Sequence, residues 1–356
     1  MAYKHSNLFL FILAGGSGER FWPLSRSKKP KHLLTLFSKK TLLEETLQRV
    51  KNLVPPRQLF ILTNAQQKKL IRQKLPHFPI QQIIIEPKKR DTAPAAALAT
   101  AIARKKNPNA IVGLLPADHL IKKIALFQKN LQRAITTAAQ NETLVTIGIS
   151  PTFPATGFGY LKIHAQPKSV QKGLPYNVNQ FLEKPDLATA KKFLKQKNYF
   201  WNAGIFFWNA NYFFHETQKY APDLAHFLKN FPTTHYQSYL RTQFPKLKKI
   251  SLDYALAEKV KTVKVIIAEF DWNDVGSWEA LVHYFQPDEN NNILIGKAAL
   301  IDCHNNIIVN KSSQFIALIG VKDTIFVVTK DATLTAHRSQ NQAIKKLFAR
   351  LPIHFR

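Results

Sequence analysis

The chain has 356 residues, with 51 Lys and Arg against 22 Asp and Glu, so its formal net charge is +29. This length allows a large domain with a smaller one, and a hydrophobic content of 45% is ordinary for a globular protein. The single cysteine, Cys303, excludes an intramolecular disulfide and a cysteine-rich zinc site.

The basic residues are spread along the chain in small groups rather than gathered in one tail. No helix-turn-helix or RNP motif accompanies them, so we interpret them as a lysine-rich surface and expect no specific nucleic-acid partner. A nonspecific nucleic-acid binder is the alternative from another class. The positive field also favours anionic nucleotides and sugar phosphates. No apolar stretch approaches the roughly 18–20 residues of a membrane helix, so we expect no membrane partner.

The first two-thirds of the chain alternates strand and helix patterns. Apolar runs predict strands at Leu8–Leu13, Leu59–Thr63, Gln82–Glu86, Ile111–Leu115 and Leu144–Ile149, with helices between them at about 42–51, 65–75, 93–106 and 125–140. This alternation predicts an α/β fold, Rossmann-like, with a mainly parallel mixed sheet flanked by helices. The run at Leu8–Leu13 is too short for a signal peptide, and cleavage near Ala14 would remove a strand, so we expect a cytoplasmic protein.

The pattern becomes more mixed after residue 157. Short strands are predicted at Gly159–Ile163, Val178–Leu182 and Gly204–Trp208, with helices at about 186–196, 209–218 and 252–260. The polar segment 286–292 reads as a linker, and short β-rich runs and a basic helix at Gln340–Leu351 follow it. We therefore predict a large domain over 1–285 and a small β-rich domain with a closing helix over 286–356.

A glycine-rich loop directly follows the first predicted strand. It contains Gly15, Gly16 and Gly18, and the cations Arg20 and Lys31 come soon after. Glycines let backbone N–H groups converge on an anion, and with an Arg and a Lys they predict a polyphosphate site. The spacing fits neither the Walker A loop nor the dinucleotide-binding fingerprint.

Carboxylates at two further places suggest a Mg²⁺ site. Asp118 follows the strand Ile111–Leu115, and Asp274 lies in the segment Asp271–Trp278. Mg²⁺ is usually held by one or two carboxylates with phosphate oxygens and water. Asp271 is the weaker candidate, and His119 has no second His or Cys at zinc-ligand spacing.

These segments together resemble the sugar-1-phosphate nucleotidyltransferases, and among them the mannose-1-phosphate guanylyltransferases. The resemblance rests on the glycine loop with its Trp22–Arg26 and Pro30–Lys31 continuation, and on the segments Glu86–Pro94, Gly157–Tyr160, Phe181–Pro185, Trp201–Gly204 and Asp274–Trp278. It extends less specifically through Asp331–Leu334 and Gln342–Lys346. It implies the nucleotide-diphospho-sugar transferase type of sheet followed by a short β-helix-like domain. It also implies transfer of GMP from GTP to α-D-mannose 1-phosphate with Mg²⁺.

The resemblance assigns roles to individual positions of this chain. It places the nucleotide on Leu13, Ala14, Gly15, Gly16, Gly18, Glu86, Arg90 and Asp91, and the sugar phosphate on Gly157, Glu183, Lys184 and Asn202. It makes Arg20, Lys31 and Lys184 the catalytic cations, and Asp118 and Asp274 the Mg²⁺ ligands. GTP and mannose 1-phosphate are then the partners, and a homodimer is compatible with it.

Departures from the family pattern leave alternatives open. Glu19 replaces a threonine and Asp91 an asparagine, and His32-Leu33 stands where Gln-Phe is usual. We expect Glu19 to point away from the phosphates and to pair with Arg26 or Lys28. A nucleotidyltransferase for another sugar 1-phosphate or base, or a catalytically impaired regulatory paralogue, are the alternative interpretations. The chain resembles a short form without a fused isomerase domain, so we expect no isomerase activity.

Overall fold

The computed structural model describes residues 7–166 and 169–356, which form two compact units, each discontinuous in sequence. The first unit contains the chain up to Gly15, Leu47–Ala117 and Ile121–Trp272, and the second contains Gly16–Thr46, Asp118–Leu120 and Asn273–Arg356. The chain therefore passes from the first unit to the second inside the glycine loop. These units combine segments that are far apart in sequence, whereas the sequence analysis expected a single boundary between residues 285 and 286. That domain boundary stays a prediction.

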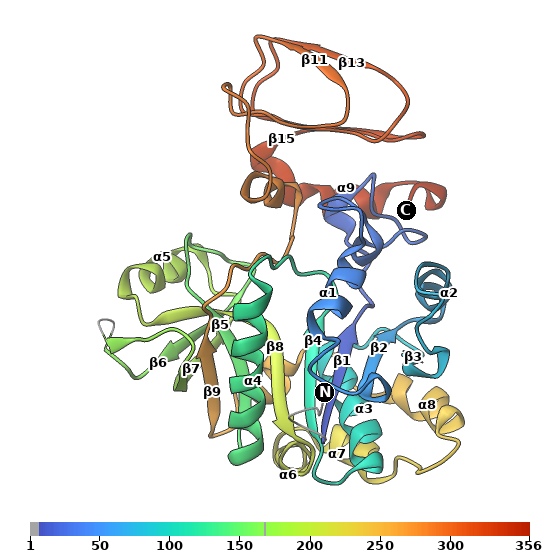
Figure 1. The fold of residues 1–356 in the computed structure, drawn as a ribbon, viewed down its shortest axis with the longest axis vertical. Coiled ribbons are helices and arrows are strands. Elements are labelled where there is room, and N and C mark those ends of the chain that lie inside the picture. The colour runs from blue at the N-terminus through green and yellow to red at the C-terminus, as the bar shows by residue number, and fades with distance from the viewer. Residues whose placement is uncertain (1–6, 167–168) are drawn as a thin grey trace. The chain divides into compact units, whose positions relative to one another are not determined.

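Among the described residues, a nine-stranded sheet forms the centre of the first unit (Figure 1). The strand order is β3-β2-β1-β4-β8-β5-β9-β7-β6. The strands are β1 (Leu8–Leu13), β2 (Leu59–Thr63), β3 (Ile83–Ile85), β4 (Ile111–Pro116), β5 (Leu144–Ile149), β6 (Gly159–Ile163), β7 (Pro175–Glu183), β8 (Tyr199–Asn209) and β9 (Val263–Ile267). The sheet is mixed, as expected: β3, β2, β1 and β4 are parallel, β5 is parallel to β9, and each antiparallel pair includes β7 or β8.

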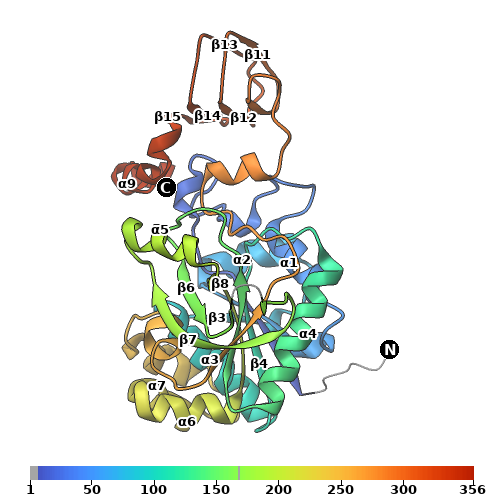
Figure 2. The same ribbon diagram turned by 90° about the vertical axis from the view of Figure 1, so that its left-hand side faces the viewer.

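Two long helices cover the middle of this sheet and explain why β4 is apolar throughout. The helix α3 (Thr92–Lys106) packs against β1 and β4, and α4 (Ile124–Gln140) packs against β4, β5, β8 and β9. They lie on opposite sides of the sheet (Figure 2). Strands covered on both faces read as continuous apolar runs, which is the pattern of Ile111–Leu115.

The remaining helices include two that the sequence did not indicate. They are α1 (Leu42–Val50), α2 (Ala65–Lys74), α5 (Leu187–Gln196), α6 (Ala210–Tyr220), α7 (Pro222–Lys229), α8 (Gln237–Gln243) and α9 (Ile344–Arg350). The helices α7 and α8 were not predicted because segments of about two turns give little periodic signal. The helix predicted over 252–260 is instead a short π-helix, Asp253–Ala257.

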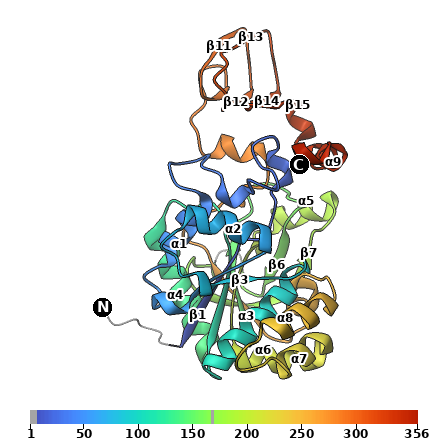
Figure 3. The same ribbon diagram turned by 90° about the vertical axis from the view of Figure 1, so that its right-hand side faces the viewer.

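The second unit contains the β-rich C-terminal part of the chain (Figure 3). One sheet joins β10 (Ile293–Ile295), β12 (Ile307–Asn310), β14 (Thr324–Val328) and β15 (Thr333–His337), and another joins β11 (Ala298–Ile301) and β13 (Ile316–Ile319). Their pairings are parallel except for β14 with β15. The expected β-helix-like arrangement is confirmed. The predicted closing helix is in part a 3₁₀ turn, Arg338–Ala343, which precedes α9.

The core of the second unit unites its first and last segments. Phe21 and Trp22 belong to the same buried cluster as Trp278 and as Ile344 and Phe348 of α9. The ring centroids of Phe21 and Trp278 are 5.0 Å apart. The segment that follows the glycine loop is therefore built into the C-terminal core.

Candidate functional site

The end of β1 is fixed within the first unit by backbone and hydroxyl contacts. The N–H of Ala14 donates to Leu62 O at 2.8 Å, and Ala117 N–H donates to Leu13 O at 3.0 Å. The hydroxyl of Thr63 donates to Ala14 O at 2.6 Å. The predicted nucleotide residues Leu13 and Ala14 thus lie at the carboxyl end of a parallel strand, where α/β sheets bind ligands.

In the second unit, the loop continues with two glycines, of which Gly18 occupies a position that requires glycine. Gly18 has φ of 72°, and a Cβ added there would overlap the Lys31 side chain. Gly16 has open space on the side where a Cβ would stand. The N–H of Lys31 donates to Ser17 O at 3.3 Å, which ties the loop to the second predicted cation.

Arg20 lies in a single 3₁₀ turn, Glu19–Phe21, whose last residue is buried. Its Nε is buried without a hydrogen-bond partner among the residues that the structure describes. Arg20 is close enough to Asp274 to lower the pKa of that carboxyl, although burial has the larger and opposite effect. A half-buried guanidinium whose Nε donor is unused is suited to receive an anion.

The predicted cation and the two predicted metal ligands lie together in the second unit. Lys31 Nζ is 2.7 Å from Asp118 Oδ2 and donates to the backbone oxygen of Asp274 at 2.6 Å. A short antiparallel bridge between Leu120 and Asn273 joins the two acidic segments, with N–H to O distances of 2.9 and 3.1 Å. This bridge explains how two aspartates more than 150 residues apart converge.

The electrostatics of the two aspartates differ. Burial would raise the pKa of Asp118, but the Lys31 ammonium together with His119 and His32 outweighs it, and the pKa is lowered. Burial raises the pKa of Asp274, and the Asp118 carboxylate adds to this while Lys31 opposes it. A divalent cation would relieve the repulsion between the two carboxylates.

The donor set fits Mg²⁺ better than zinc. Asp118 and Asp274 offer hard carboxylate oxygens, and Mg²⁺ takes one or two of these with phosphates and water. Over residues 7–166 and 169–356, no three His, Cys, Asp or Glu side chains gather as a ready-made metal cage. His32 is buried nearby, and burial lowers its pKa to about 4, so it contributes no charge here at neutral pH.

The predicted base-recognition segment begins beside the glycine loop and caps α3, all within the first unit. A Cβ on Gly15 would stand 3.5 Å from Glu86 Oε2. Burial, with a contribution from the Asp91 carboxylate, raises the pKa of Glu86 to about 8. Asp91 has φ of 71° and accepts the Thr92 N–H at 2.9 Å. The guanidinium of Arg90 donates to Pro245 O, so its present partner is backbone.

The predicted sugar-phosphate residues come from three places: Gly157 precedes β6, Glu183 and Lys184 stand at the end of β7, and Asn202 lies on β8. Glu183 pairs with Gly159 across these strands, and Lys184 N–H donates to Phe158 O at 3.2 Å. Lys184 Nζ is 2.6 Å from Glu183 Oε1, with the lysine half-exposed and the glutamate buried. Burial lowers the pKa of Lys184, but Glu183 outweighs it and the net pKa is raised. Gly157 has open space where a Cβ would stand.

Both the oxygen and the nitrogen of the Asn202 side-chain amide form hydrogen bonds within the protein. Its Oδ1 accepts the Thr146 hydroxyl at 2.7 Å and the Gly204 N–H at 3.1 Å. Its Nδ2 donates to Asp253 Oδ1 at 2.8 Å. The amide oxygen is therefore occupied by protein donors, and the amide orients Asp253.

Glu19 does not have the partner expected from the sequence. The Arg26 guanidinium instead forms two bonds with Asp331, at 2.6 and 2.7 Å. The Glu19 carboxylate accepts the Ser17 hydroxyl at 3.1 Å. The pairing with Arg26 was wrong because Asp331, 305 residues away in sequence, provides a better-placed carboxylate.

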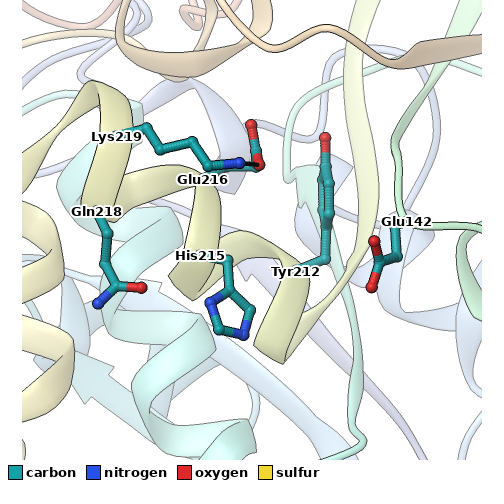
Figure 4. Close-up of a pocket in the computed structure, with 6 residues that line it drawn as sticks. All are labelled: Glu142, Tyr212, His215, Glu216, Gln218 and Lys219. Atoms are coloured by element: carbon teal, nitrogen blue, oxygen red, sulfur yellow. Dashed lines mark hydrogen bonds and ion pairs between the residues drawn. The ribbon is translucent and has the colours of Figure 1, made fainter.

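A separate pocket of about 300 Å³ lies against α6 in the first unit (Figure 4). It is lined by Glu142, Tyr212, His215, Glu216, Gln218 and Lys219. Lys219 Nζ donates to Glu216 Oε1 at 2.7 Å, and burial raises the pKa of Tyr212 to about 12. None of the residues that the sequence singled out lines this pocket.

Residues 10–291 match the model of the nucleotidyl transferase family. The chain belongs to the nucleotidyl transferase family. Residues 296–351 match the MannoseP isomerase/GMP-like beta-helix domain, which agrees with the sheets of the second unit.

Curated relatives of this nucleotidyl transferase match nearly its whole length. A putative mannose-1-phosphate guanylyltransferase of Vibrio cholerae is 35% identical over 96% of this chain and 73% of its own. A mannose-1-phosphate guanylyltransferase of Escherichia coli is 32% identical over 98% of this chain and 76% of its own.

Solved structures share the fold. A Thermus thermophilus protein described as a mannose-1-phosphate geranyltransferase has a TM-score of 0.85 at 30% identity, covering 97% of this chain and 99% of that one. A mannose-6-phosphate isomerase of Helicobacter pylori has a TM-score of 0.60 at 24% identity, covering 75% of this chain and 99% of that one, and supports the fold alone.

One acidic residue of this nucleotidyl transferase was missed from the sequence. Asp253 lies beside Glu183, and burial together with that carboxylate raises the pKa of Asp253 to about 7. In the sequence it lies inside a predicted helix, with no signal that it meets Asn202. Leu252 N–H donates to the Thr92 hydroxyl at 2.8 Å, so the segments around Asp91 and Asp253 are joined.

The raised pKa values predict how stability changes with pH. Burial shifts the pKa of Glu86 from 4.5 to about 8 and that of Asp253 from 3.8 to about 7. In these windows the unfolded chain has lost protons that the folded protein keeps, so stability should fall as pH rises. Glu86→Gln and Asp253→Asn should each gain stability relative to the unchanged protein between about pH 5 and about pH 8.5. Urea midpoints at the two pH values test this, and a pH-independent difference would contradict it.

Glu19→Thr should change activity by less than about tenfold, because its carboxylate accepts a hydroxyl bond and exposed charge contacts contribute little. The measurement is kcat/KM for the nucleotide. A larger gain would mean that Glu19 repels the substrate phosphates and would favour an impaired paralogue.

Proposed function

We propose that this chain transfers GMP from GTP to α-D-mannose 1-phosphate and releases pyrophosphate. The observation that carries the proposal is the gathering of Lys31, Asp118 and Asp274 in the second unit, in a chain whose curated relatives are guanylyltransferases. The Vibrio cholerae and Escherichia coli proteins support mannose 1-phosphate as the sugar substrate and GTP as the nucleotide.

The reaction needs no nucleophile from the protein. An anionic phosphate oxygen of mannose 1-phosphate forms a bond to the α-phosphorus of GTP, the bond from that phosphorus to the β-phosphate oxygen breaks, and pyrophosphate leaves. The protein contributes by orienting the two anions and by stabilising the charge that develops. In this proposal Arg20 and Lys31 neutralise the nucleotide phosphates, and Lys184 binds the sugar phosphate.

Asp118 and Asp274 are the proposed ligands of Mg²⁺. When bound, the cation polarises phosphate oxygens and offsets their negative charge. Lys31 already contacts Asp118 Oδ2, so this ammonium can keep the carboxylate oriented before substrates arrive.

The nucleotide and sugar halves of the proposed site use different contacts. Glu86, Arg90 and Asp91, with the backbone at Leu13, Ala14, Gly15, Gly16 and Gly18, are proposed to bind the nucleotide. Glu183 and Asn202, with the backbone at Gly157, are proposed to bind the sugar. Asp253 joins this second group as the carboxylate that Asn202 orients.

Location and assembly stay predictions. No helix of the described residues is long and apolar enough to cross a membrane. A cytoplasmic location and a homodimer are proposals that fractionation and light scattering test.

A substrate panel tests the function. Pyrophosphate release would be measured with GTP, ATP, UTP, CTP and dTTP, each with mannose 1-phosphate or glucose 1-phosphate, with and without Mg²⁺. We expect the highest kcat/KM for GTP with mannose 1-phosphate and loss of turnover on chelation. Preference for another pair would assign a related transferase, and no turnover with any pair would favour the impaired paralogue.

A further inference from the structure

Two residues from the C-terminal part of the chain, Asp331 and Phe355, contact the segment that follows Arg20. Arg26 Nη1 and Nη2 bind Asp331 Oδ2 and Oδ1 at 2.6 and 2.7 Å, and Arg26 Nε donates to Pro23 O at 3.0 Å. A two-bond fork between a guanidinium and a carboxylate fixes orientation as well as distance. The fork therefore holds Arg26 against the turn between β14 and β15 within the second unit.

A second anchor lies closer to Arg20. Trp22 Nε1 donates to Phe355 O at 2.9 Å, and Trp22 O accepts from Trp278 Nε1 at 3.3 Å. Trp22 is 6% exposed and Trp278 is fully buried. The Arg26 guanidinium also lies 5.8 Å from the centroid of the Phe355 ring, so the two anchors share a residue.

We propose that Asp331 and Phe355 are positioning residues for the phosphate loop and determine how well it binds the nucleotide. This inference rests on the proposed function. The turn that carries Arg20 ends at the buried Phe21 and is followed at once by Trp22. Both anchors therefore act within six residues of the proposed phosphate-binding guanidinium.

The physical reason is the entropy of ordering a loop. Fixing the backbone of one residue costs roughly 1–2 kcal/mol, and a ligand that must order a mobile loop loses that free energy from its affinity. The contacts of Asp331 and Phe355 order the loop before the nucleotide binds. Lys184, Glu183 and Asn202 belong to the other unit. The contacts of Asp331 and Phe355 should therefore have little effect on the affinity for the sugar phosphate.

The test uses Asp331→Asn, which keeps the shape of the side chain but removes its charge. Since Asp331 is about half exposed, we expect KM for GTP to rise about threefold to tenfold, with KM for mannose 1-phosphate changed less than about twofold. Asp331→Glu should restore most of the loss. A second variant that lacks residues 352–356 should show the same selective rise in KM for GTP.

Glu279→Gln is the matched control for stability. Arg338 and Glu279 form a similar fork in the same unit, at 2.9 and 2.6 Å, and the Arg338 guanidinium joins it to Asn305 rather than to residues 17–29. This variant should lower Tm by about as much as Asp331→Asn does, without changing the ratio of the two KM values. A purely structural role of Asp331 would make the two variants indistinguishable, and that result would overturn the proposal.

Hydrogen exchange separates this proposal from the proposed function. In the ligand-free protein, Asp331→Asn should speed amide exchange in residues 17–29 by about threefold or more, whereas Glu279→Gln should not. If the unchanged protein makes no GDP-mannose but this difference appears and GTP binding weakens with it, the function fails and the positioning role stands. If GDP-mannose forms normally and neither exchange nor KM for GTP changes, the positioning role fails alone.

Discussion

Replacing Asp118 or Asp274 by asparagine should lower turnover of GTP with mannose 1-phosphate by about a hundredfold or more. Asparagine keeps the size of the side chain but removes the negative charge that would hold Mg²⁺. The Lys31 ammonium, 2.7 Å from Asp118, would then lose its ion-pair partner in the first variant. Steady-state kcat over a range of Mg²⁺ concentrations measures the effect.

Asp271→Asn is the control for these two variants. Asp271 accepts the backbone N–H groups of Lys122 and Lys123 at 2.9 and 2.7 Å, so its role is to hold a turn. We expect a lower Tm in this variant with kcat within about threefold of normal. Near-normal, Mg²⁺-dependent turnover in either Asp118→Asn or Asp274→Asn would remove that residue from the metal site.

Arg20→Ala and Lys184→Ala should each weaken the binding of a different substrate. Hydrogen bonds to charged groups contribute about 1.5–3 kcal/mol, which corresponds to a change of about tenfold to a hundredfold. Arg20→Ala should raise KM for GTP most, since its guanidinium has a buried donor without a partner among the described residues. Lys184→Ala should raise KM for mannose 1-phosphate most.

Lys219→Ala serves as the control for the loss of a cation. Lys219 is exposed and pairs with Glu216 on α6, which is not part of the proposed site. It should change neither KM by more than about twofold. If Arg20→Ala and Lys184→Ala raised KM for the same substrate, our division into nucleotide and sugar halves would be wrong.

The sequence predicted the site best where one segment alone carries the geometry. The apolar run Leu8–Leu13 and the glycines after it indicate a strand followed by an anion-binding loop, and the structure contains that strand. The same holds for the helix predicted at about 93–106, which the structure begins at Thr92 with Asp91 as its N-cap. Local propensity and capping determine such features, so one sequence is enough to find them.

Contacts between distant segments could not be predicted in this way. The Leu120 and Asn273 bridge brings Asp118 to Asp274, and the sequence alone gave no register for it. Asp253 was missed because its partner Asn202 is 51 residues away, and Asp331 was missed as the partner of Arg26 because 305 residues separate them. Such pairs depend on the topology of the whole fold, which charge and periodicity do not specify.

The contact between Trp22 and Phe355 also bears on how the protein is made. These residues are 333 positions apart, and a ribosome adds about 5–20 residues per second, so Trp22 waits roughly 17 to 67 s for its partner. During this time Phe21 and Trp22 lack the α9 residues that bury them in the finished protein. The phosphate loop is thus among the first segments synthesised, and it reaches its final packing only after residues 344–355 have emerged.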